Sequence, residues 1–363
     1  MKILFVFGTR PEAIKMAPLI LKLRQDLDVK VCVTGQHRQM LDSVLELFKI
    51  VPDFNLNLMK KNQNLEYLTG KILSGVTEIL KQEKFDWVLV QGYTTSTMAG
   101  AMAAFYQKIK IGHVEAGLRT FNLEDPFPEE LNRQITSKMA TLHFAPTEKN
   151  YQNLLNEGCP KEKIHITGNT IIDSLKWVLK NVPEPEESLE FADTHEPIIL
   201  VTGHRRENFG DGLIQICSAL KKIAKHFPHI QIVYPVHLNP NVQNPVKRIL
   251  SKIKNVHLLK PLGYPEFIHL MNRSHLIMKD SGGVQEEAPS LGKPVLVMRK
   301  TTERSEAVEA GTVKLVGTNS DNIFEEAQNL LSDHSKFKAM SIAHNPYGEG
   351  NACEKISRFI LGN

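Results

Sequence analysis

The sequence has little cysteine and lacks long apolar runs, and these two absences exclude whole classes of protein. Its four cysteines, Cys32, Cys159, Cys217 and Cys353, stand far apart and form no CxxC pair. Cys32 and Cys217 lie inside apolar runs, where we expect buried thiols. A disulfide framework or a cysteine zinc site is not expected, and a reducing compartment fits. No run approaches the roughly 18 apolar residues of a membrane span, and the opening MKILFVFG lacks the longer apolar core of a signal peptide. A cytoplasmic protein without a membrane segment is expected.

The sequence also has only a small excess of positive over negative charge. The chain has 44 Lys and Arg against 40 Asp and Glu, which gives a formal net charge of +4. This excess is spread along the chain, whereas nucleic-acid-binding proteins concentrate basic residues in one stripe. The chain contains neither GxGxxG nor the P-loop pattern, and its His and Asp residues lack the helical i, i+4 spacing of a metal site. We expect no nucleic-acid partner, no nicotinamide and no metal.

Short apolar, β-branched segments alternate with helix-length amphipathic stretches along the whole chain. Their spacing predicts helices that include Glu12–Gln25, Arg38–Phe48 and Leu65–Gln82. The expected strands are Ile3–Phe7, Val29–Thr34, Trp87–Gln91, Lys110–Val114, Thr141–Ala145, Ile198–Thr202, Ile230–Pro235, Val256–Leu259, Leu276–Lys279, Val295–Met298 and Thr312–Leu315. This alternation predicts an α/β fold with parallel sheets covered on both faces. The length of 363 residues suggests two domains, and the Pro- and Glu-rich segment Asn181–Pro197 is typical of a connection between them.

Doubly wound sheets bind ligands at the carboxyl ends of their strands, so the segments that follow the expected strands are the candidates for a site. In the first half, GTRPEAIK leads into a helix that carries Arg10 and Lys15, a natural place for an anionic group. Glu115 leaves a later strand, and Glu129 opens a helix after two prolines. These glutamates could converge as acid and base. The alternatives are a structural salt bridge from Glu115 to Arg119 and capping of the helix by Glu129.

In the second half, GHRREN follows a strand and brings His204, Arg205 and Arg206 together, which favours a phosphate contact. The most specific segment is DSGGVQEEA, in which Ser281-Gly282-Gly283 leads directly from a strand into a helix. Its backbone N–H groups could cradle a diphosphate. Glu287, one helical turn further on, could accept both hydroxyls of a ribose.

Three further residues of the second half are weaker candidates. His237 follows a strand, Phe267 could line a flat base pocket, and Arg304 could contact a sugar. Core packing for Phe267 and a solvated turn for Arg304 are the alternatives.

Seven segments stand in an order that is known from one family. They are GTRPEAIK, HVEAGLRT, PEELNR, GHRREN, DSGGVQEEAPSLGKPVLV, TTERSEAVEAGTVKLVG and NPYGEGNA. Together they resemble the non-hydrolysing bacterial UDP-N-acetylglucosamine 2-epimerases, from Lys2 to about Ala352. The resemblance implies a glycosyltransferase-B-like fold of two Rossmann-like, doubly wound domains with a central cleft. These would comprise residues 1–170 with a returning helix at about 352–363, and residues 171–351.

The resemblance also implies an activity, partners and roles for the candidates. UDP-GlcNAc and UDP-ManNAc would be interconverted for cell-surface polysaccharide synthesis, by anti elimination and re-addition of UDP, in a homodimer that needs no cofactor. The catalytic positions would be Lys15, Tyr93, Glu115, Glu129 and His204, with Arg133 supporting Glu129. The substrate would contact Arg10, Arg133, His237, Phe267, Ser281, Gly282, Gly283, Glu287 and Arg304. A second, activating UDP-GlcNAc would contact Gln36, His37, Gln39, Gln63 and one or both of Arg205 and Arg206.

The chain departs from the family pattern at Tyr93. The family usually has H-G-D-T-T where this chain has Gln91-Gly92-Tyr93-Thr94-Thr95. A phenol, with a pKa of about 10, does not replace a carboxylate at neutral pH. Ser305 and Leu262 also depart, at positions that bind mainly through the backbone. Three functions stay open: an epimerase with an activity reduced by Tyr93, a catalytically impaired nucleotide-sugar-binding homologue, and a glycosyltransferase of the same fold.

Overall fold

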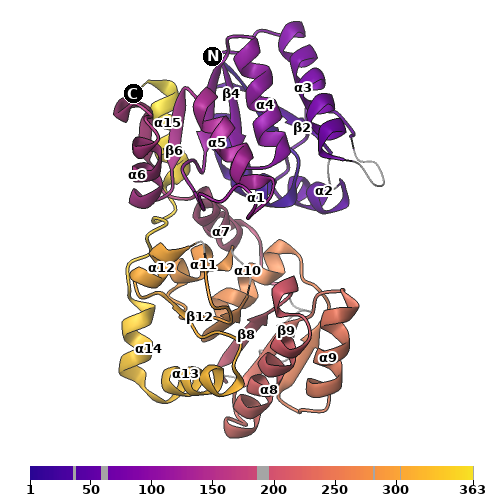
Figure 1. Ribbon diagram of the computed structural model, residues 1–363, viewed down its shortest axis with the longest axis vertical. Coiled ribbons are helices and arrows are strands. Elements are labelled where there is room, and N and C mark those ends of the chain that lie inside the picture. Colours follow the sequence, from indigo (N-terminus) through magenta and orange to yellow (C-terminus); the bar gives the residue numbers. More distant parts are fainter. Residues whose placement is uncertain (36–37, 59–63, 186–195, 281–282, 303, 363) are drawn as a thin grey trace. The chain divides into compact units, whose positions relative to one another are not determined.

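The computed structural model describes residues 1–35, 38–58, 64–185, 196–280, 283–302 and 304–362. By their internal packing they form two compact units (Figure 1). Unit 1 comprises Met1–Lys176 and Tyr347–Asn363, and unit 2 comprises Trp177–Pro346. Most of the predicted connection Asn181–Pro197 lies outside the described residues.

Unit 1 is built on a seven-stranded parallel sheet of order β3-β2-β1-β4-β5-β6-β7. The strands are β1 (Lys2–Phe7), β2 (Asp28–Val33), β3 (Phe54–Asn55), β4 (Trp87–Gln91), β5 (Lys110–Val114), β6 (Leu142–Ala145) and β7 (Ile164–Ile166). The helices are α1 (Arg10–Leu23), α2 (Arg38–Leu47), α3 (Leu65–Gln82), α4 (Thr95–Tyr106), α5 (Glu129–Met139), α6 (Glu148–Asn156), α7 (Thr170–Asn181) and α15 (Ala352–Leu361). Every residue of β4 is buried, so helices cover both faces of the sheet.

Unit 2 is built on a six-stranded parallel sheet of order β10-β9-β8-β11-β12-β13. The strands are β8 (Ile198–Thr202), β9 (Gln231–Pro235), β10 (Val256–Leu259), β11 (Leu276–Lys279), β12 (Val295–Val297) and β13 (Val313–Leu315). The helices are α8 (Asp211–His226), α9 (Pro240–Leu250), α10 (Tyr264–Arg273), α11 (Val284–Glu287), α12 (Ser305–Glu309), α13 (Ser320–Ser332) and α14 (His334–Ser341). Alternating strands and helices in both units confirm the predicted α/β class.

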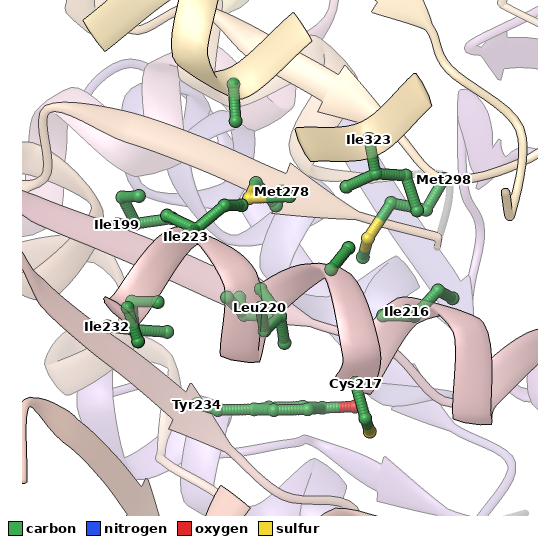
Figure 2. Close-up of a cluster of buried hydrophobic side chains, with 14 of the residues drawn as sticks. Ile199, Ile216, Cys217, Leu220, Ile223, Ile232, Tyr234, Met278, Met298 and Ile323 are labelled. Carbon is green, nitrogen blue, oxygen red and sulfur yellow. The ribbon is translucent and has the colours of Figure 1, made fainter. Parts of the chain in front are cut away.

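The core of unit 2 shows why this sequence folds in layers. Helix α8 buries Ile216, Leu220 and Ile223, whose spacing of four and three residues places them on one helical face. Figure 2 shows this face packed beside strand residues such as Ile199 and Met278. Burial of such a contiguous apolar face is the main favourable contribution to folding.

Two further sequence expectations concern cysteine and membrane spans. All four cysteines are buried, which confirms the burial expected for Cys32 and Cys217. Throughout the described ranges, no helix has both the length and the apolar character needed to cross a bilayer.

The C-terminal helix α15 belongs to unit 1 and is tied to α7 by one carboxylate. Asp173 of α7 accepts hydrogen bonds from the backbone N–H groups of Ala352, at 3.2 Å, and Cys353, at 3.0 Å. These are N–H groups of the first helical turn, which have no partner within the helix itself. Asp173 therefore fixes the start of α15.

Candidate functional site

Strand order identifies where each unit is built to hold a ligand. In unit 1 the order reverses between β1 and β4, and in unit 2 it reverses between β8 and β11. Loops leaving the carboxyl ends of two such strands diverge and leave a crevice, which is where doubly wound sheets bind ligands. Three of these four loops carry segments singled out from the sequence, and the fourth carries Tyr93. We describe the two switch points separately.

Glu115 is a buried carboxylate that receives donors from three other elements. It follows β5, is 5% exposed, and has a φ of 59°, in the left-handed region that non-glycine residues rarely adopt. The Nζ of Lys15, from α1, lies 2.5 Å from its Oε2. The amide of Gln91, at the end of β4, donates to the same oxygen. The amide of Asn169 lies 3.5 Å from the other oxygen.

These contacts decide between the two interpretations of Glu115. The alternative salt bridge to Arg119 does not form, because the Nε of Arg119 pairs with the Oε1 of Glu157 at 2.6 Å. Glu115 is instead aimed at Lys15, beside the switch point. Strained backbone at a buried charged pair is a feature that clusters at active sites.

Glu12 joins the two loops of the unit 1 switch point, a role that the sequence did not reveal. It is 2% exposed and accepts the backbone N–H groups of Gly8, at 3.1 Å, and Thr9, at 2.8 Å. It also accepts the hydroxyl of Thr94, at 2.6 Å, from the loop after β4. Burial raises the pKa of Glu12, although these hydrogen bonds oppose the shift. The T-x-x-E pattern of a capping box was the signal that could have found it.

Tyr93 lies in the loop after β4, partly exposed, next to Thr94. Its carbonyl oxygen accepts the amide of Asn132 at 3.1 Å. The guanidinium carbon of Arg133 lies 5.3 Å from the centre of its ring, which is a cation–π contact. Position 93 is therefore held against the first turns of α5.

Arg133 has a different carboxylate partner from the one expected. The sequence predicts that it supports Glu129, but its Nε lies 2.7 Å from the Oε2 of Glu130. Burial alone would raise the pKa of Glu130. Hydrogen bonds from the Thr120 amide, the Gln134 side chain and Arg133 instead lower it to about 2. Glu130 is thus an ionised structural partner of Arg133.

Glu129 is partly exposed at the first residue of α5. Its carboxylate makes no hydrogen bond or ion pair with any described residue. It follows Phe127, which is 66% exposed, and Arg10 is also exposed at the start of α1. Glu129 and Arg10 are therefore available to a ligand, whereas Glu115 and Lys15 already contact each other.

Asp280 organises the switch point of unit 2. It is buried after β11 and accepts the backbone N–H groups of His204, at 3.0 Å, and Arg205, at 2.9 Å, both from the loop after β8. The ring of His204 stacks on that of His237, with centres 5.3 Å apart. Partial burial lowers the pKa of His204, although the charge of Asp280 opposes the shift. At neutral pH His204 is therefore an uncharged imidazole. Arg206 is exposed beside it.

Helix α11 carries two buried carboxylates with different partners. Glu287 accepts the hydroxyl of Tyr264, from α10, at 3.1 Å. Burial, and then the charge of Glu287, raise the pKa of that phenol. The Nε of Arg304 lies 2.7 Å from Glu286, so the residue expected on a sugar has a protein partner. Tyr264 was missed from the sequence, where only its place after the strand Val256–Leu259 distinguished it.

Gly283 and Phe267 complete the described part of this switch point. A Cβ placed on Gly283 would have no atom within 4 Å, so its surroundings are open. Phe267 is partly buried in α10, and its backbone N–H donates to the carbonyl of Gly263 at 3.1 Å. That N–H is thus already used within the protein.

Six predicted residues cannot be placed. Ser281, Gly282, Gln36, His37 and Gln63 lie outside the described residues, as does the side chain of Gln39. Over the ranges that the structure does describe, no group of three or more His, Cys, Asp or Glu residues could hold a metal ion.

Comparison with known proteins gives evidence for the family of the chain that does not depend on the geometry of the site. A family model described as UDP-N-acetylglucosamine 2-epimerase matches residues 20–361. A relative from Campylobacter jejuni with the name UDP-N-acetylglucosamine 2-epimerase is 56% identical over 372 residues, which covers 99% of this chain and 97% of the relative.

Two solved structures resemble the chain over its whole length. The UDP-GlcNAc 2-epimerase from Neisseria meningitidis, bound to UDP-GlcNAc, matches with a TM-score of 0.91 at 51% identity, covering 100% of both chains. The enzyme from Methanocaldococcus jannaschii, in complex with UDP-GlcNAc and UDP, matches with a TM-score of 0.81 at 34% identity, again covering 100% of both chains.

Proposed function

The chain belongs to the UDP-N-acetylglucosamine 2-epimerase family. We propose that it interconverts UDP-GlcNAc and UDP-ManNAc by eliminating UDP from the sugar and adding it back, with two carboxylates of unit 1 as the proton-transferring groups. The observation that carries this proposal is the contact of Glu115 with Lys15 and Gln91 beside the switch point. The hydrogen at C-2 of the sugar is weakly acidic, so its removal needs an oriented base in a site that excludes water.

The proposed reaction is an isomerisation, which leaves the composition of the substrate unchanged. One carboxylate removes the proton from C-2 while the C-1–oxygen bond breaks, and UDP leaves on the opposite face to give 2-acetamidoglucal. UDP then adds back at C-1, and a proton is delivered to C-2 on the other face. Glu115 and Glu129 are the two carboxylates that we assign to these faces. The available carboxylate of Glu129 suits a group that meets the sugar directly.

Unit 2 would bind the UDP group. The loop after β11 and the neutral ring of His204 would contact the diphosphate, while Glu287, oriented by Tyr264, would accept the ribose hydroxyls. Arg304 would contact the sugar only through groups that its pairing with Glu286 leaves available. His237 would support His204 through their ring contact.

Tyr93 would slow this reaction. Its ring stands over the guanidinium of Arg133, at the position where the family pattern has an aspartate. The chain would then bind nucleotide sugar normally and turn it over slowly.

The proposal also includes regulation by a second nucleotide, assembly into a homodimer and a location in the cytoplasm. The Methanocaldococcus jannaschii structure holds both UDP-GlcNAc and UDP, which supports a second nucleotide site. The exposed Arg205 and Arg206 would contribute to it. The proposed homodimer is tested by light scattering in solution. Buried free thiols fit the reducing cytoplasm, where polysaccharide precursors would be made.

Incubation of the purified protein with UDP-GlcNAc alone tests the function. Chromatographic separation should show UDP-ManNAc with no free sugar released. A glycosyltransferase would leave UDP-GlcNAc unchanged without an acceptor. A protein that only binds would also leave it unchanged, with UDP-GlcNAc binding still measurable by calorimetry.

A further inference from the structure

Lys279 is a fully buried lysine at the carboxyl end of β11, directly before Asp280. Its side chain is 0% exposed, and its Nζ has no hydrogen-bond partner among the described residues. An unpaired ammonium is costly to bury, and proteins usually avoid that cost by keeping the group neutral. None of the roles proposed for the segments singled out from the sequence explains why a lysine is buried at this position.

The alternation of β11 places Lys279 away from the apolar core of unit 2. Leu276 and Met278 belong to the buried cluster of which Figure 2 shows a part. Successive side chains of a strand point to opposite faces. Lys279 therefore points to the other face of the sheet. The charged groups that act on it are Arg304, Glu287, Asp280 and Glu286.

The three carboxylates near this lysine already have donors. Arg304 pairs with Glu286, and the Tyr264 hydroxyl donates to Glu287. Asp280 accepts backbone N–H groups from the loop after β8. Within the described ranges, Lys279 therefore has negative charge nearby but no direct acceptor.

We propose that Lys279 takes up one proton from solvent when a nucleoside diphosphate binds at the carboxyl end of β11. The only bond that forms is N–H on Nζ, and the proton comes from the buffer. The inference rests on the proposed function, because it requires UDP or a UDP sugar to bind at this switch point.

The charges around Lys279 explain why UDP binding and proton uptake would be coupled. Burial, and then the positive charge of Arg304, lower the pKa of Lys279 well below its usual value. A bound diphosphate adds two or more negative charges, and opposite charge favours the protonated amine. His204 is a neighbouring imidazole whose pKa is lowered chiefly by burial, and the charge of Lys279 acts on it as well. The experiment must therefore separate the two.

Calorimetric titration of the full chain with UDP at pH 8, in Tris and in HEPES, measures the proton uptake, and two variants assign it. At that pH His204, with its lowered pKa, is neutral, and a terminal phosphate with a pKa of about 6 is fully ionised. Because the two buffers differ in ionisation enthalpy, the difference in binding heat measures protons taken up. We expect uptake approaching one proton per UDP. The Kd for UDP should weaken by up to about tenfold per pH unit above pH 8.

Two variants test whether Lys279 is the group that takes up the proton. Lys279→Met should abolish the uptake and raise the melting temperature, because it removes a buried polar group that has no partner. Lys293→Met is the matched control: Lys293 is a partly buried lysine whose pKa burial also lowers, but it lies at the amino end of the parallel strand β12, whereas Lys279 lies at the carboxyl end of β11. This control should keep the uptake.

The outcomes separate this inference from the function. If UDP binds the unaltered chain without proton uptake, or if the uptake persists in Lys279→Met, the inference is wrong and the function stands. If UDP does not bind the unaltered chain at all, both are wrong.

Discussion

At the scale of single residues, position 93 decides whether the first switch point holds a further carboxylate. Glu115 already contacts Lys15 and Gln91, and Glu129 is available at the start of α5. Tyr93, in the loop after β4, contributes an aromatic ring over Arg133 and a carbonyl oxygen bound by Asn132. The ring of a tyrosine can pack and its hydroxyl can donate one hydrogen bond, but a phenol does not ordinarily carry a charge at neutral pH.

Replacement of Tyr93 by aspartate should therefore raise the rate of epimerisation at least a hundredfold. General acid–base groups typically contribute about 10²–10⁴-fold, and the new carboxylate would lie beside the guanidinium of Arg133. Affinity for UDP, which we assign to unit 2, should change little. Tyr93→Phe is the control and should be as slow as the unaltered chain. Equal rates for Tyr93→Asp and the unaltered chain would show that the two glutamates suffice.

The diphosphate loop gives a second residue-scale prediction. Gly283→Val should weaken UDP binding at least tenfold, about 1.4 kcal/mol, because a branched side chain would fill the open space that we assign to phosphate. The backbone of Gly283 is helical, with φ −54°, and a Cβ there contacts nothing. Stability should therefore be unchanged. Gly70→Val in α3, where a Cβ also contacts nothing, is the control. Unaltered UDP affinity in calorimetry would place the diphosphate elsewhere.

Sequence patterns indicated candidate residues for the site but not the partners of these residues. Arg133 stands four residues after Glu129 and three after Glu130, and both spacings place side chains side by side on a helix. The sequence could not choose between them, and the structure pairs Arg133 with Glu130. Tyr264 and Glu287 are 23 residues apart, so their contact depends on how α10 and α11 pack.

At the scale of elements, hydrophobic patterning predicted every described strand except two short edge strands of unit 1. The predicted bounds of β4, β5, β8, β10 and β11 are those observed. The edge strands β3, of two residues, and β7, of three, were not predicted. Such short strands have no apolar run of their own, and they form because a neighbouring strand offers backbone hydrogen bonds.

The start of α15 provides a test at this scale. Asp173→Ala removes the acceptor of two N–H groups in the first turn of α15. Loss of a helix cap costs about 0.5–2 kcal/mol. Amide hydrogen exchange in residues 352–361 should therefore accelerate by about two- to thirtyfold. Exchange in α13, capped separately by Asn319, is the internal control and should not change. Unchanged exchange in α15 would mean that Asp173 is not needed to hold it.

At the scale of the whole molecule, the proposed substrate contacts are divided between the two units. Arg10, Glu115 and Glu129 belong to unit 1, and His204 and Glu287 belong to unit 2. A ligand that contacts both units stabilises whichever arrangement allows both sets of contacts, by its difference in affinity between arrangements. No pattern in the sequence predicts that arrangement, because contacts across domains follow from packing and not from periodicity.

Nucleotide sugar should therefore compact the protein. Small-angle X-ray scattering should show a smaller radius of gyration with saturating UDP-GlcNAc than without it. UDP alone, which lacks the sugar that we assign to unit 1, should have a smaller effect. An unchanged radius with saturating UDP-GlcNAc would mean that the ligand does not draw the units together.

Exchange of the hydrogen at C-2 tests the account most directly, because elimination and re-addition replace that hydrogen with one from solvent. The protein is incubated with UDP-GlcNAc in deuterated water, and the epimers are separated and weighed by mass spectrometry. We predict UDP-ManNAc that carries one deuterium at C-2, formed slowly by the unaltered chain and faster by Tyr93→Asp. UDP-ManNAc without deuterium, or UDP-GlcNAc that binds but is neither epimerised nor labelled by either protein, would contradict the account.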